Sequence, residues 1–376
     1  MVGATDPASI RALDLSQGLP PNPKNLQRVA AETNPDAARW AFSQWELRKR
    51  AQTKHLPHAS ELLLTKEALE QATHYEIARY HAGLFPPGAL VADLTTGVGS
   101  DLIAMAERGP VRGYEIERER YECAVYNCFV CGAAAEVVNR DCLAGEWDFE
   151  YAVADPARRV AGKRTSDPAE FEPNPALLSA RMASLKLGII KLSPLLPDEF
   201  LRGLGPGLQF VSFGGECREA LVLCGQEAPS GRWAVMVGQE SLLEERQISS
   251  EAQVPDRFLY EADPAVIRAH AMGSLPGADA MSLLGDSNGY LTSSVESASP
   301  WVKSYRVVDS GRFDLKQVRA SLRELGRGCR VVKSRAKGVE AETLLKQIRC
   351  AGNAEAILVL YAVEKSVRYA LVEPFG

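Results

Sequence analysis

The sequence predicts an α/β protein built on a doubly wound parallel sheet, with a helical region before the sheet and a small α+β domain after it. Between Ala89 and Leu192, apolar runs typical of buried strands alternate with helical stretches at the spacing of βαβ units. The chain has 376 residues, of which 46% are hydrophobic and 24% charged. This length and composition provide more than one folding unit with a core, and they exclude a mostly disordered or fibrous chain.

The first predicted part is the helical region, residues 1–85. Pro35 opens an alanine-rich helix, and Thr65 is placed to cap a second helix that runs through Tyr80. Pro86-Pro87-Gly88 then interrupts the helical pattern. The sheet domain is therefore predicted to begin at residue 86.

The remaining boundaries follow from changes in the hydrophobic pattern. Residues 86–240 are predicted to form the sheet domain, which we expect to finish with an antiparallel hairpin of Glu219–Leu223 and Trp233–Val237 around a turn rich in Gly, Pro and Ser. The largely polar segment 241–300 is predicted to be a linker and connecting segment. Residues 301–376 are predicted to be the small α+β domain.

The sequence lacks the signals of a membrane or secreted protein. No apolar run reaches the roughly 18 residues of a membrane span, and Met1–Pro20 has no signal-peptide pattern, so we expect a cytoplasmic protein with reduced cysteines. Cys123, Cys128 and Cys131 have the spacing of a plant-type iron–sulfur protein, with Cys142 as a candidate fourth ligand. On the helix predicted there, these cysteines point in different directions, which favours free thiols over a metal site.

Basic residues are concentrated near the C-terminus. The net charge is only −5, yet Trp301–Cys350 carries 13 Lys or Arg against five Asp or Glu, a local charge of +8. A basic domain on an acidic body is typical of a protein that binds a polyanion, such as a nucleic acid, through its phosphates, while the alternative is a solvated basic face. The residues of this segment that we expect to contact RNA are Arg330, Lys333, Arg335 and Lys337.

The most informative motif is the glycine turn that follows the first predicted strand, from Asp93 to Gly99. Gly97 and Gly99 allow the backbone to approach a ligand, and the helix that follows favours a negative group at its N-terminus. In an NAD-binding turn the third glycine would fall at position 102, which is Leu. The motif therefore argues against a dinucleotide.

Three acids end the first three predicted strands, and their positions suit S-adenosylmethionine. Asp93 can accept a hydrogen bond from the ammonium of this cofactor, and Glu115, 22 residues later, can take both ribose hydroxyls. Asp141 can meet the adenine amino group. Each acid alone is better explained as solvated or capping, but the three together with the glycine turn indicate a binding site.

The fourth strand ends in Asp155-Pro156-Ala157-Arg158-Arg159, at the edge where open α/β sheets bind ligands. The Asp155 carboxylate and the Pro156 carbonyl can accept hydrogen bonds from a substrate N–H and align its lone pair. The alternative is a structural Asp-Pro turn. Lys191 lies inside the apolar fifth strand and requires an anionic partner, for which a crevice acid is a candidate.

On these residues, the stretch from Leu90 to Val237 resembles class I S-adenosylmethionine-dependent methyltransferases, which have a Rossmann-like fold. The matching positions are the glycine turn from Asp93 through Thr95 to Gly99, the ribose acid Glu115, the adenine acid Asp141 and the strand-four motif at Asp155. Most of the chain is also similar to bacterial methyltransferases with a C-terminal THUMP-like domain, on residues 64–73, 155–159, 260–268 and 313–316. That resemblance implies an RNA substrate, tRNA or rRNA, delivered by the C-terminal domain.

One position departs from the family. Enzymes that methylate base amines usually follow the Asp-Pro pair with Pro and an aromatic residue, whereas Ala157 and Arg158 stand here, and Arg158 could stack on a base through its guanidinium. The leading hypothesis is methylation of a base amine, such as guanine N2. Its cofactor residues are Asp93, Thr95, Gly97, Gly99, Glu115 and Asp141, its catalytic residues are Asp155, Pro156 and Arg158, and it uses no metal. The alternatives are a small-molecule methyltransferase and an RNA-binding protein with a catalytically weak core.

Overall fold

The computed structural model describes residues 6–157, 159–160, 163–165, 167–239, 241–286, 289–348, 352 and 354–375. The chain forms two compact units, one of Met1–Leu208 with Ala220–Ser230 and the other of Gln209–Glu219 with Gly231–Gly376. The second unit thus begins inside the predicted sheet domain. No helix in the described part of the chain combines the length and the apolar character that a bilayer crossing requires.

The N-terminal region of the first unit is helical, as predicted. Its helices are α1 (Pro7–Ser16), α2 (Pro23–Glu32), α3 (Pro35–Gln52), α4 (Lys66–Gln71) and α5 (Tyr75–Gly83). The first three each begin with a proline after a capping residue, Asp6, Asn22 or Asn34, whose side chain accepts a backbone N–H.

The helix predicted to start after Thr65 is two helices. The Thr65 hydroxyl accepts the Ala68 N–H at 3.1 Å and caps α4, but the chain leaves the helix after Gln71 and resumes as α5 at Tyr75. Within this break, the Thr73 hydroxyl donates to the carboxylate of Asp101, in the sheet domain, at 2.6 Å. The interruption therefore brings a side chain of the N-terminal region to the sheet.

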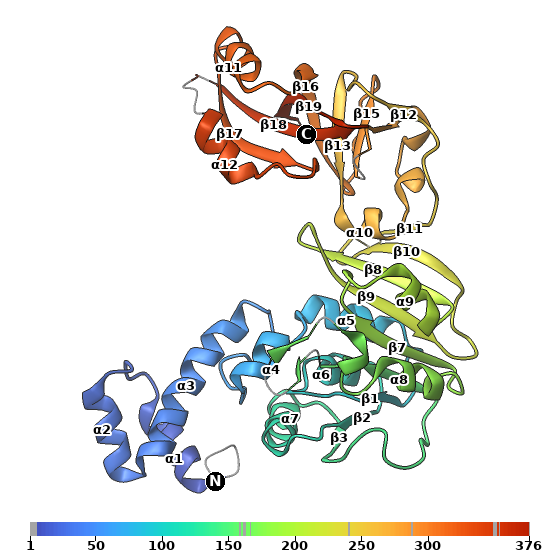
Figure 1. The fold of residues 1–376 in the computed structure, drawn as a ribbon. Coiled ribbons are helices and arrows are strands. Elements are labelled where there is room, and N and C mark those ends of the chain that lie inside the picture. Colours follow the sequence, from blue (N-terminus) through green and yellow to red (C-terminus); the bar gives the residue numbers. More distant parts are fainter. Residues whose placement is uncertain are drawn as a thin grey trace. The chain divides into compact units, whose positions relative to one another are not determined.

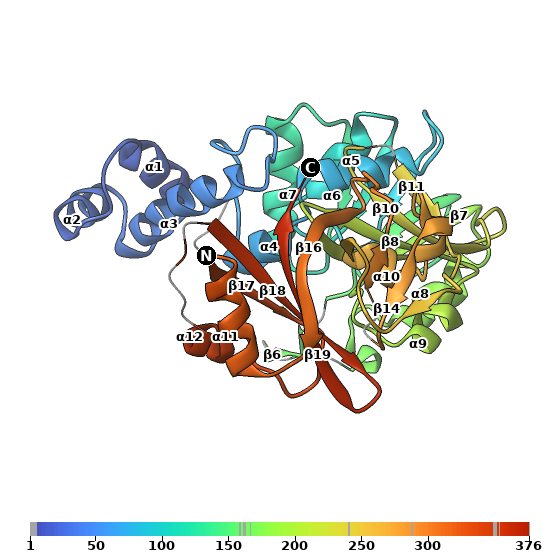
Figure 2. The ribbon, with the colours of Figure 1, turned by 90° about the horizontal axis from the view of Figure 1, so that it is seen from above.

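The parallel sheet of the first unit confirms the predicted fold class. Its strands run in the order β9-β7-β4-β1-β2-β3, and all neighbours are parallel except β9, which is antiparallel to β7. Figure 2 shows α5, α6 and α7 grouped together, apart from α8 and α9. The strands are β1 (Val91–Asp93), β2 (Val111–Tyr114), β3 (Ala135–Val138), β4 (Tyr151–Ala154), β7 (Leu187–Leu192) and β9 (Glu216–Cys224). The helices are α6 (Ser100–Ala106), α7 (Arg118–Val130), α8 (Pro175–Met182) and α9 (Asp198–Leu204).

The segment between β4 and α8 contains short elements: β5 (Arg159–Val160), β6 (Lys163–Arg164) and a 3-10 turn (Pro168–Glu170).

The N-terminal helices pack on the sheet domain through a shared apolar cluster. Leu47, Leu63 and Leu69 of the helical region are buried together with Val98 of the glycine turn and Cys123 of α7. Burial raises the pKa of the Cys123 thiol to about 12, as it does for Cys128. These cysteines are thus part of a packed helix face.

The buried Asn127 of α7 strengthens this junction. Its amide accepts the Leu63 N–H and donates to the carbonyls of Leu63 and Val98, all at 2.8–2.9 Å. One side chain therefore joins α7, the N-terminal region and the glycine turn.

The predicted hairpin is wrong. The two strands expected to pair, within β9 and β10 (Gly231–Met236), are separated by β8 (Gly207–Phe213), which lies between them in the sheet. The tight turn is at Gly214 and Gly215, both with positive φ, a conformation that glycine adopts readily and that suits two-residue hairpins. The Gly, Pro and Ser residues after β9 instead belong to a longer crossing to β10.

The predicted linker, residues 241–300, is folded. Strand β11 (Ser241–Glu244) pairs with β10 at the edge of the sheet, and its exposed side chains are Leu242 and Glu244. The rest of the segment contributes to an eight-stranded sheet of order β12-β14-β15-β13-β16-β19-β18-β17 (Figure 1). Its elements are β12 (Glu251–Ala252), β13 (Phe258–Ala262), α10 (Pro264–Arg268), two 3-10 turns (Met272–Ser274 and Ala278–Ala280), β14 (Ser282–Leu284) and β15 (Tyr290–Ser293).

The C-terminal elements complete this sheet. They are β16 (Val302–Arg312), α11 (Leu315–Glu324), β17 (Arg327–Ser334), α12 (Ala341–Ile348), β18 (Ala354–Val363) and β19 (Ser366–Pro374). Along β18, Leu358 and Leu360 pack under Val318 of α11 and Leu344 of α12, while Val359 and Tyr361 face the opposite core. This alternation, with both helices on one face, gives the sheet two apolar layers.

Candidate active site

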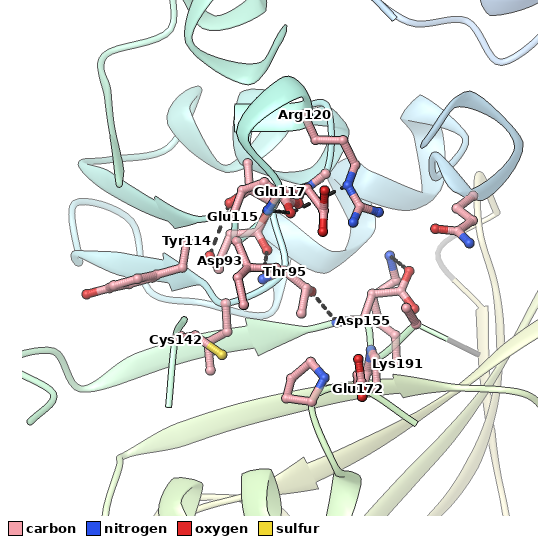
Figure 3. Close-up of a pocket in the computed structure, with 18 of the residues that line it drawn as sticks. Asp93, Thr95, Tyr114, Glu115, Glu117, Arg120, Cys142, Asp155, Glu172 and Lys191 are labelled. Atoms are coloured by element: carbon pink, nitrogen blue, oxygen red, sulfur yellow. Dashed lines mark hydrogen bonds and ion pairs between the residues drawn. The ribbon is translucent and has the colours of Figure 1, made fainter. Parts of the chain in front are cut away.

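A cavity of about 1050 Å³ opens at the carboxyl ends of β1 to β4, all within the first unit. Figure 3 shows its lining, with Glu115 and Arg120 toward one end and Asp155, Lys191 and Glu172 toward the other. Seven of the nine residues assigned to the cofactor and to catalysis line it: Asp93, Thr95, Gly97, Glu115, Asp141, Asp155 and Pro156. Gly99 instead caps α6, and Arg158 lies outside the described residues.

The glycine turn has the open backbone that its sequence predicts. Gly97 has φ +59°, and a Cβ placed there would find no atom within 4 Å. Gly99, with φ +95°, is the N-cap of α6. Both conformations disfavour a side chain, and the uncovered Gly97 backbone leaves room for a ligand against the turn.

Glu115 follows β2 and is held by the backbone. Its two carboxylate oxygens accept the N–H groups of Gly97 at 2.9 Å and Glu117 at 2.8 Å, and Arg120 Nε lies 3.5 Å away. Burial raises the pKa of Glu115 despite these partners. Each oxygen retains a second lone pair, so the fixed carboxylate can still accept hydroxyl groups from the cavity.

Asp93 ends β1 and is buried, with 4% of its surface exposed. One of its oxygens accepts the Thr95 N–H at 3.1 Å. Burial, and next the neighbouring Asp101 carboxylate, raise the pKa of Asp93 to about 8. The site thus contains an acid that would be ionised more easily beside a cation.

Asp141 lies in the exposed loop after β3. It accepts the Leu143 N–H at 2.8 Å, which shapes the turn. The neighbouring Asn139 donates to the carbonyls of Glu115 and Ile116 at 2.8 and 3.0 Å. The ends of β2 and β3 are therefore joined, and Asp141 faces the same cavity as Glu115.

Asp155, at the end of β4, has its backbone fixed and its side chain partly exposed. Its N–H donates to the Thr95 hydroxyl at 2.6 Å, and 45% of the side chain is accessible. Two residues further on, Ala157 exchanges two backbone hydrogen bonds with Glu172, at 2.7 and 3.2 Å. Glu172 also lines the cavity, a position that no local motif in the sequence indicated.

Lys191 has the anionic partners that its position in an apolar strand required. It is 4% exposed, and its Nζ lies 2.9 Å from Asp101 Oδ2, 3.1 Å from Asp155 Oδ2 and 2.6 Å from the Thr73 hydroxyl. On the other side of Asp101, His81 Nδ1 lies 2.7 Å from Oδ1. Burial alone would raise the pKa of Asp101, but Lys191 and His81 hold it well below its usual range.

Comparisons with known proteins agree with this architecture. An uncharacterised S-adenosylmethionine-dependent methyltransferase from Mycobacterium tuberculosis (strain CDC 1551 / Oshkosh) is 26% identical over 337 residues, covering 86% of this chain and 93% of its own. A protein of the same description from strain H37Rv matches equally. A Porphyromonas gingivalis W83 structure, of inferred methyltransferase activity, superposes with a TM-score of 0.75 at 20% identity, covering 99% of this chain and 96% of that one. No family model matches.

The fold is that of a class I methyltransferase. Within the described residues of this methyltransferase, the cavity is strongly acidic, because nine acidic side chains line it against three basic ones. Such a wall attracts cationic groups and repels phosphates. The acids are Glu70, Asp93, Asp101, Glu115, Glu117, Asp141, Asp155, Glu170 and Glu172, and the bases are Arg120, Arg140 and Lys191.

Proposed function

We propose that this methyltransferase transfers the methyl group of S-adenosylmethionine to an amine of an RNA base, and that Asp155 aligns this amine. One observation carries the proposal: a partly exposed carboxylate, fixed through Thr95 and Lys191, lies on the same cavity as Glu115 and Asp93. The cavity thus has one wall suited to a cofactor and one suited to an acceptor.

The enzyme uses S-adenosylmethionine, and the cavity residues fit this cofactor. Asp93 is a buried acid whose pKa is raised to about 8. The cofactor's ammonium would lower this pKa, because a neighbouring cation stabilises the carboxylate. Glu115 presents a fixed carboxylate for the two ribose hydroxyls, and the open backbone at Gly97 leaves space beside them. Asp141 is the proposed acceptor for the adenine amino group.

The proposed chemistry needs positioning more than activation. When bound, S-adenosylmethionine supplies a methyl group already activated by its sulfonium. The acceptor nitrogen would form a bond to the methyl carbon as the carbon–sulfur bond breaks, the electron pair of that bond would stay on the sulfur of the departing S-adenosylhomocysteine, and the nitrogen would then lose a proton to water. Asp155 and the carbonyl of Pro156 would accept hydrogen bonds from the amine, which points its lone pair at the methyl group.

The electrostatics of the cavity favour a base over a nucleotide. Since acidic side chains dominate the lining, a phosphate would be repelled, whereas an extruded base could enter with its phosphates left outside. An RNA substrate then requires a separate basic surface for its backbone. We propose that the C-terminal elements, as a THUMP-like domain, supply that surface.

Within the described residues, three of the four basic side chains that the sequence suggested for RNA have partners, whereas the fourth, Lys337, is exposed and takes part in no ion pair. Arg330 pairs with Glu355 at 2.9 Å, Lys333 with Glu261 at 2.5 Å, and Arg335 stacks on Tyr290. By contrast, no ion pair engages three exposed bases on and just before α11, within the part of the chain that the structure describes. These are Arg312, Lys316 and Arg323.

A small-molecule methyltransferase is the second candidate, because the acidic lining also suits a small cationic amine. Under either reading the proposal places the enzyme in the cytoplasm. The methyl acceptor distinguishes the two candidates, because total RNA from a host strain lacking the gene should accept labelled methyl groups only if RNA is the substrate. Mass spectrometry of the RNA nucleosides should then identify the modified base.

Asp155→Ala tests the assigned role. We expect methyl transfer to fall by about a hundredfold or more, while S-adenosylmethionine affinity stays almost unchanged in calorimetry. Asp148→Ala is the matched control, since Asp148 is 70% exposed, pairs with Arg112 and does not line the cavity. If rate and affinity fall together, Asp155 belongs to the cofactor site or to the fold instead.

A further inference from the structure

We infer that Lys191 is a positioning residue, which holds Asp155 in the orientation that receives the acceptor amine and connects it to the N-terminal helices. This inference rests on the proposed function, because it requires Asp155 to align the acceptor. The observation behind it is the chain of contacts His81–Asp101–Lys191–Asp155, joined at its centre by Thr73.

The contacts of Lys191 are directional. An ammonium donates only, through three N–H bonds, and three oxygens lie within 3.1 Å of Nζ: Thr73 Oγ1, Asp101 Oδ2 and Asp155 Oδ2. At 4% exposure the lysine is screened from bulk water, so these contacts are much stronger than those of a surface ion pair. The nitrogen therefore has a fixed place, and the Asp155 oxygen bound to it is fixed as well.

The two acids bound to Lys191 have unequal surroundings. Asp101 is enclosed by His81, Thr73 and Lys191, and its side chain is 14% exposed. An ionised carboxylate only accepts hydrogen bonds, so His81 Nδ1 carries the hydrogen toward it. Asp155 is 45% exposed and lines the cavity. Asp101 thus acts as the anchor, and Asp155 is the member of the network that meets a substrate.

This network gives the N-terminal region a role in the reaction. Thr73 lies in the break between α4 and α5, and His81 lies on α5. Both contact Asp101, which begins the chain of charges that ends at Asp155. The break in the helix, which no sequence pattern indicated, therefore places a hydroxyl beside Lys191.

Removing the charge of Lys191 should release Asp155. The Asp101 and Asp155 carboxylates would then share a site without their common cation, so Asp155 would turn away or take up a proton. In either state it no longer presents the same acceptor to an amine. The Glu115 contacts do not involve Lys191, and Lys191 affects the pKa of Asp93 less than burial and Asp101 do, so cofactor binding should change little.

The experiment measures kcat and S-adenosylmethionine affinity for full-chain variants, with total RNA from a host strain lacking the gene as the substrate. The variants are Lys191→Met, Lys191→Arg, Asp155→Ala and a double variant that combines Lys191→Met and Asp155→Ala. We expect Lys191→Met to lower kcat by about 10- to 100-fold with S-adenosylmethionine affinity within about threefold, and Lys191→Arg to restore part of the rate. In the Asp155→Ala background, Lys191→Met should add less than about threefold, since both act through one group.

Lys186→Met is the matched control, because Lys186 directly precedes the same strand and pairs with Glu150 at 2.9 Å, but is 39% exposed and outside the cavity lining. It should retain the wild-type rate. If Asp155→Ala lowers kcat and Lys191→Met does not, the inference is overturned. If Asp155→Ala itself has the wild-type rate, the proposed function fails instead.

Thr73→Val covers the case in which Lys191→Met does not fold. It removes one acceptor from Lys191 but keeps every charge, and we expect kcat to fall by about three- to tenfold at unchanged S-adenosylmethionine affinity. That loss should disappear in the Asp155→Ala background. An unchanged kcat for Thr73→Val would overturn the inference.

Discussion

The raised pKa of Asp93 predicts a pH dependence of cofactor binding that can be worked out from the structure. The free enzyme holds the proton of this acid up to about pH 8. If the ammonium of S-adenosylmethionine binds the ionised form, the observed affinity follows the ionised fraction, which is about a tenth at pH 7 and about a hundredth at pH 6. Affinity should therefore rise about tenfold between these values, close to 1.4 kcal/mol.

Two-buffer calorimetry measures this effect directly. At pH 7, binding should release about 0.9 proton per site, which appears as a dependence of the measured heat on the ionisation enthalpy of the buffer. The range should stay below about pH 7.5, because an α-amino group such as that of the cofactor loses its own proton near pH 7.7–8.0. Equal affinity at pH 6 and pH 7, without proton release, would refute the reasoning.

The variant Asp93→Asn is the control, and it also tests the effect on stability. Its cofactor affinity should be flat between pH 6 and 7.5. The folded state keeps the Asp93 proton to about pH 8, whereas the unfolded chain loses it near pH 3.9, so the folded state binds more protons in between and stability falls as pH rises across this window. Asp93→Asn should therefore raise Tm more at pH 8 than at pH 5.

Three further predictions concern separate parts of the molecule. Glu115→Ala should weaken S-adenosylmethionine binding by about 1 to 3 kcal/mol in calorimetry, since a fixed, charged acceptor for two hydroxyls is lost. Asn127→Leu should lower the free energy of unfolding by about 3 kcal/mol or more in urea titrations, because it leaves three buried backbone groups without their hydrogen bonds; a loss below about 1 kcal/mol would contradict this. Charge reversal of three exposed bases on and just before α11 should weaken the salt dependence of RNA binding in filter binding, lowering the slope of log affinity against log salt by about one unit per lost phosphate contact. Charge reversal of three exposed bases in the N-terminal helices is the control and should leave this slope unchanged. The reversed residues are Arg312, Lys316 and Arg323, and the control residues are Lys24, Arg28 and Lys49.

The sequence predicted the parallel sheet and seven of the residues that line the cavity because those features are local. A strand that ends in an acid, followed by a glycine turn and a helix, is readable over about ten residues, and parallel strands bring their carboxyl ends to one edge. Asp93, Glu115 and Asp155 could therefore be assigned to one site before any fold was known. Their roles there remain proposals.

The parts that escaped prediction depend on contacts between distant segments. Lys191 clearly needed an anion, but its partners Asp101 and Thr73 lie about 90 and 118 residues earlier, and no pattern specifies such pairs. The hairpin failed for a different reason: the Gly, Pro and Ser residues after β9 resemble a tight turn, whereas the turn is made by Gly214 and Gly215. Likewise, the basic side chains at 330 and 333 looked free because their acidic partners lie on other strands.

The division of the chain into units has a consequence for its synthesis. Residues 209–219 belong to the second unit, although residues 220–230 return to the first. A ribosome therefore releases the first segment of the second unit before residues 220–224, the part of β9 that pairs with β7 in the first. Neither unit corresponds to one uninterrupted stretch of the gene, so stopping translation after residue 208 would leave β7 without its neighbour β9. We expect the newly made chain to finish its cofactor-binding half only after it has begun the other.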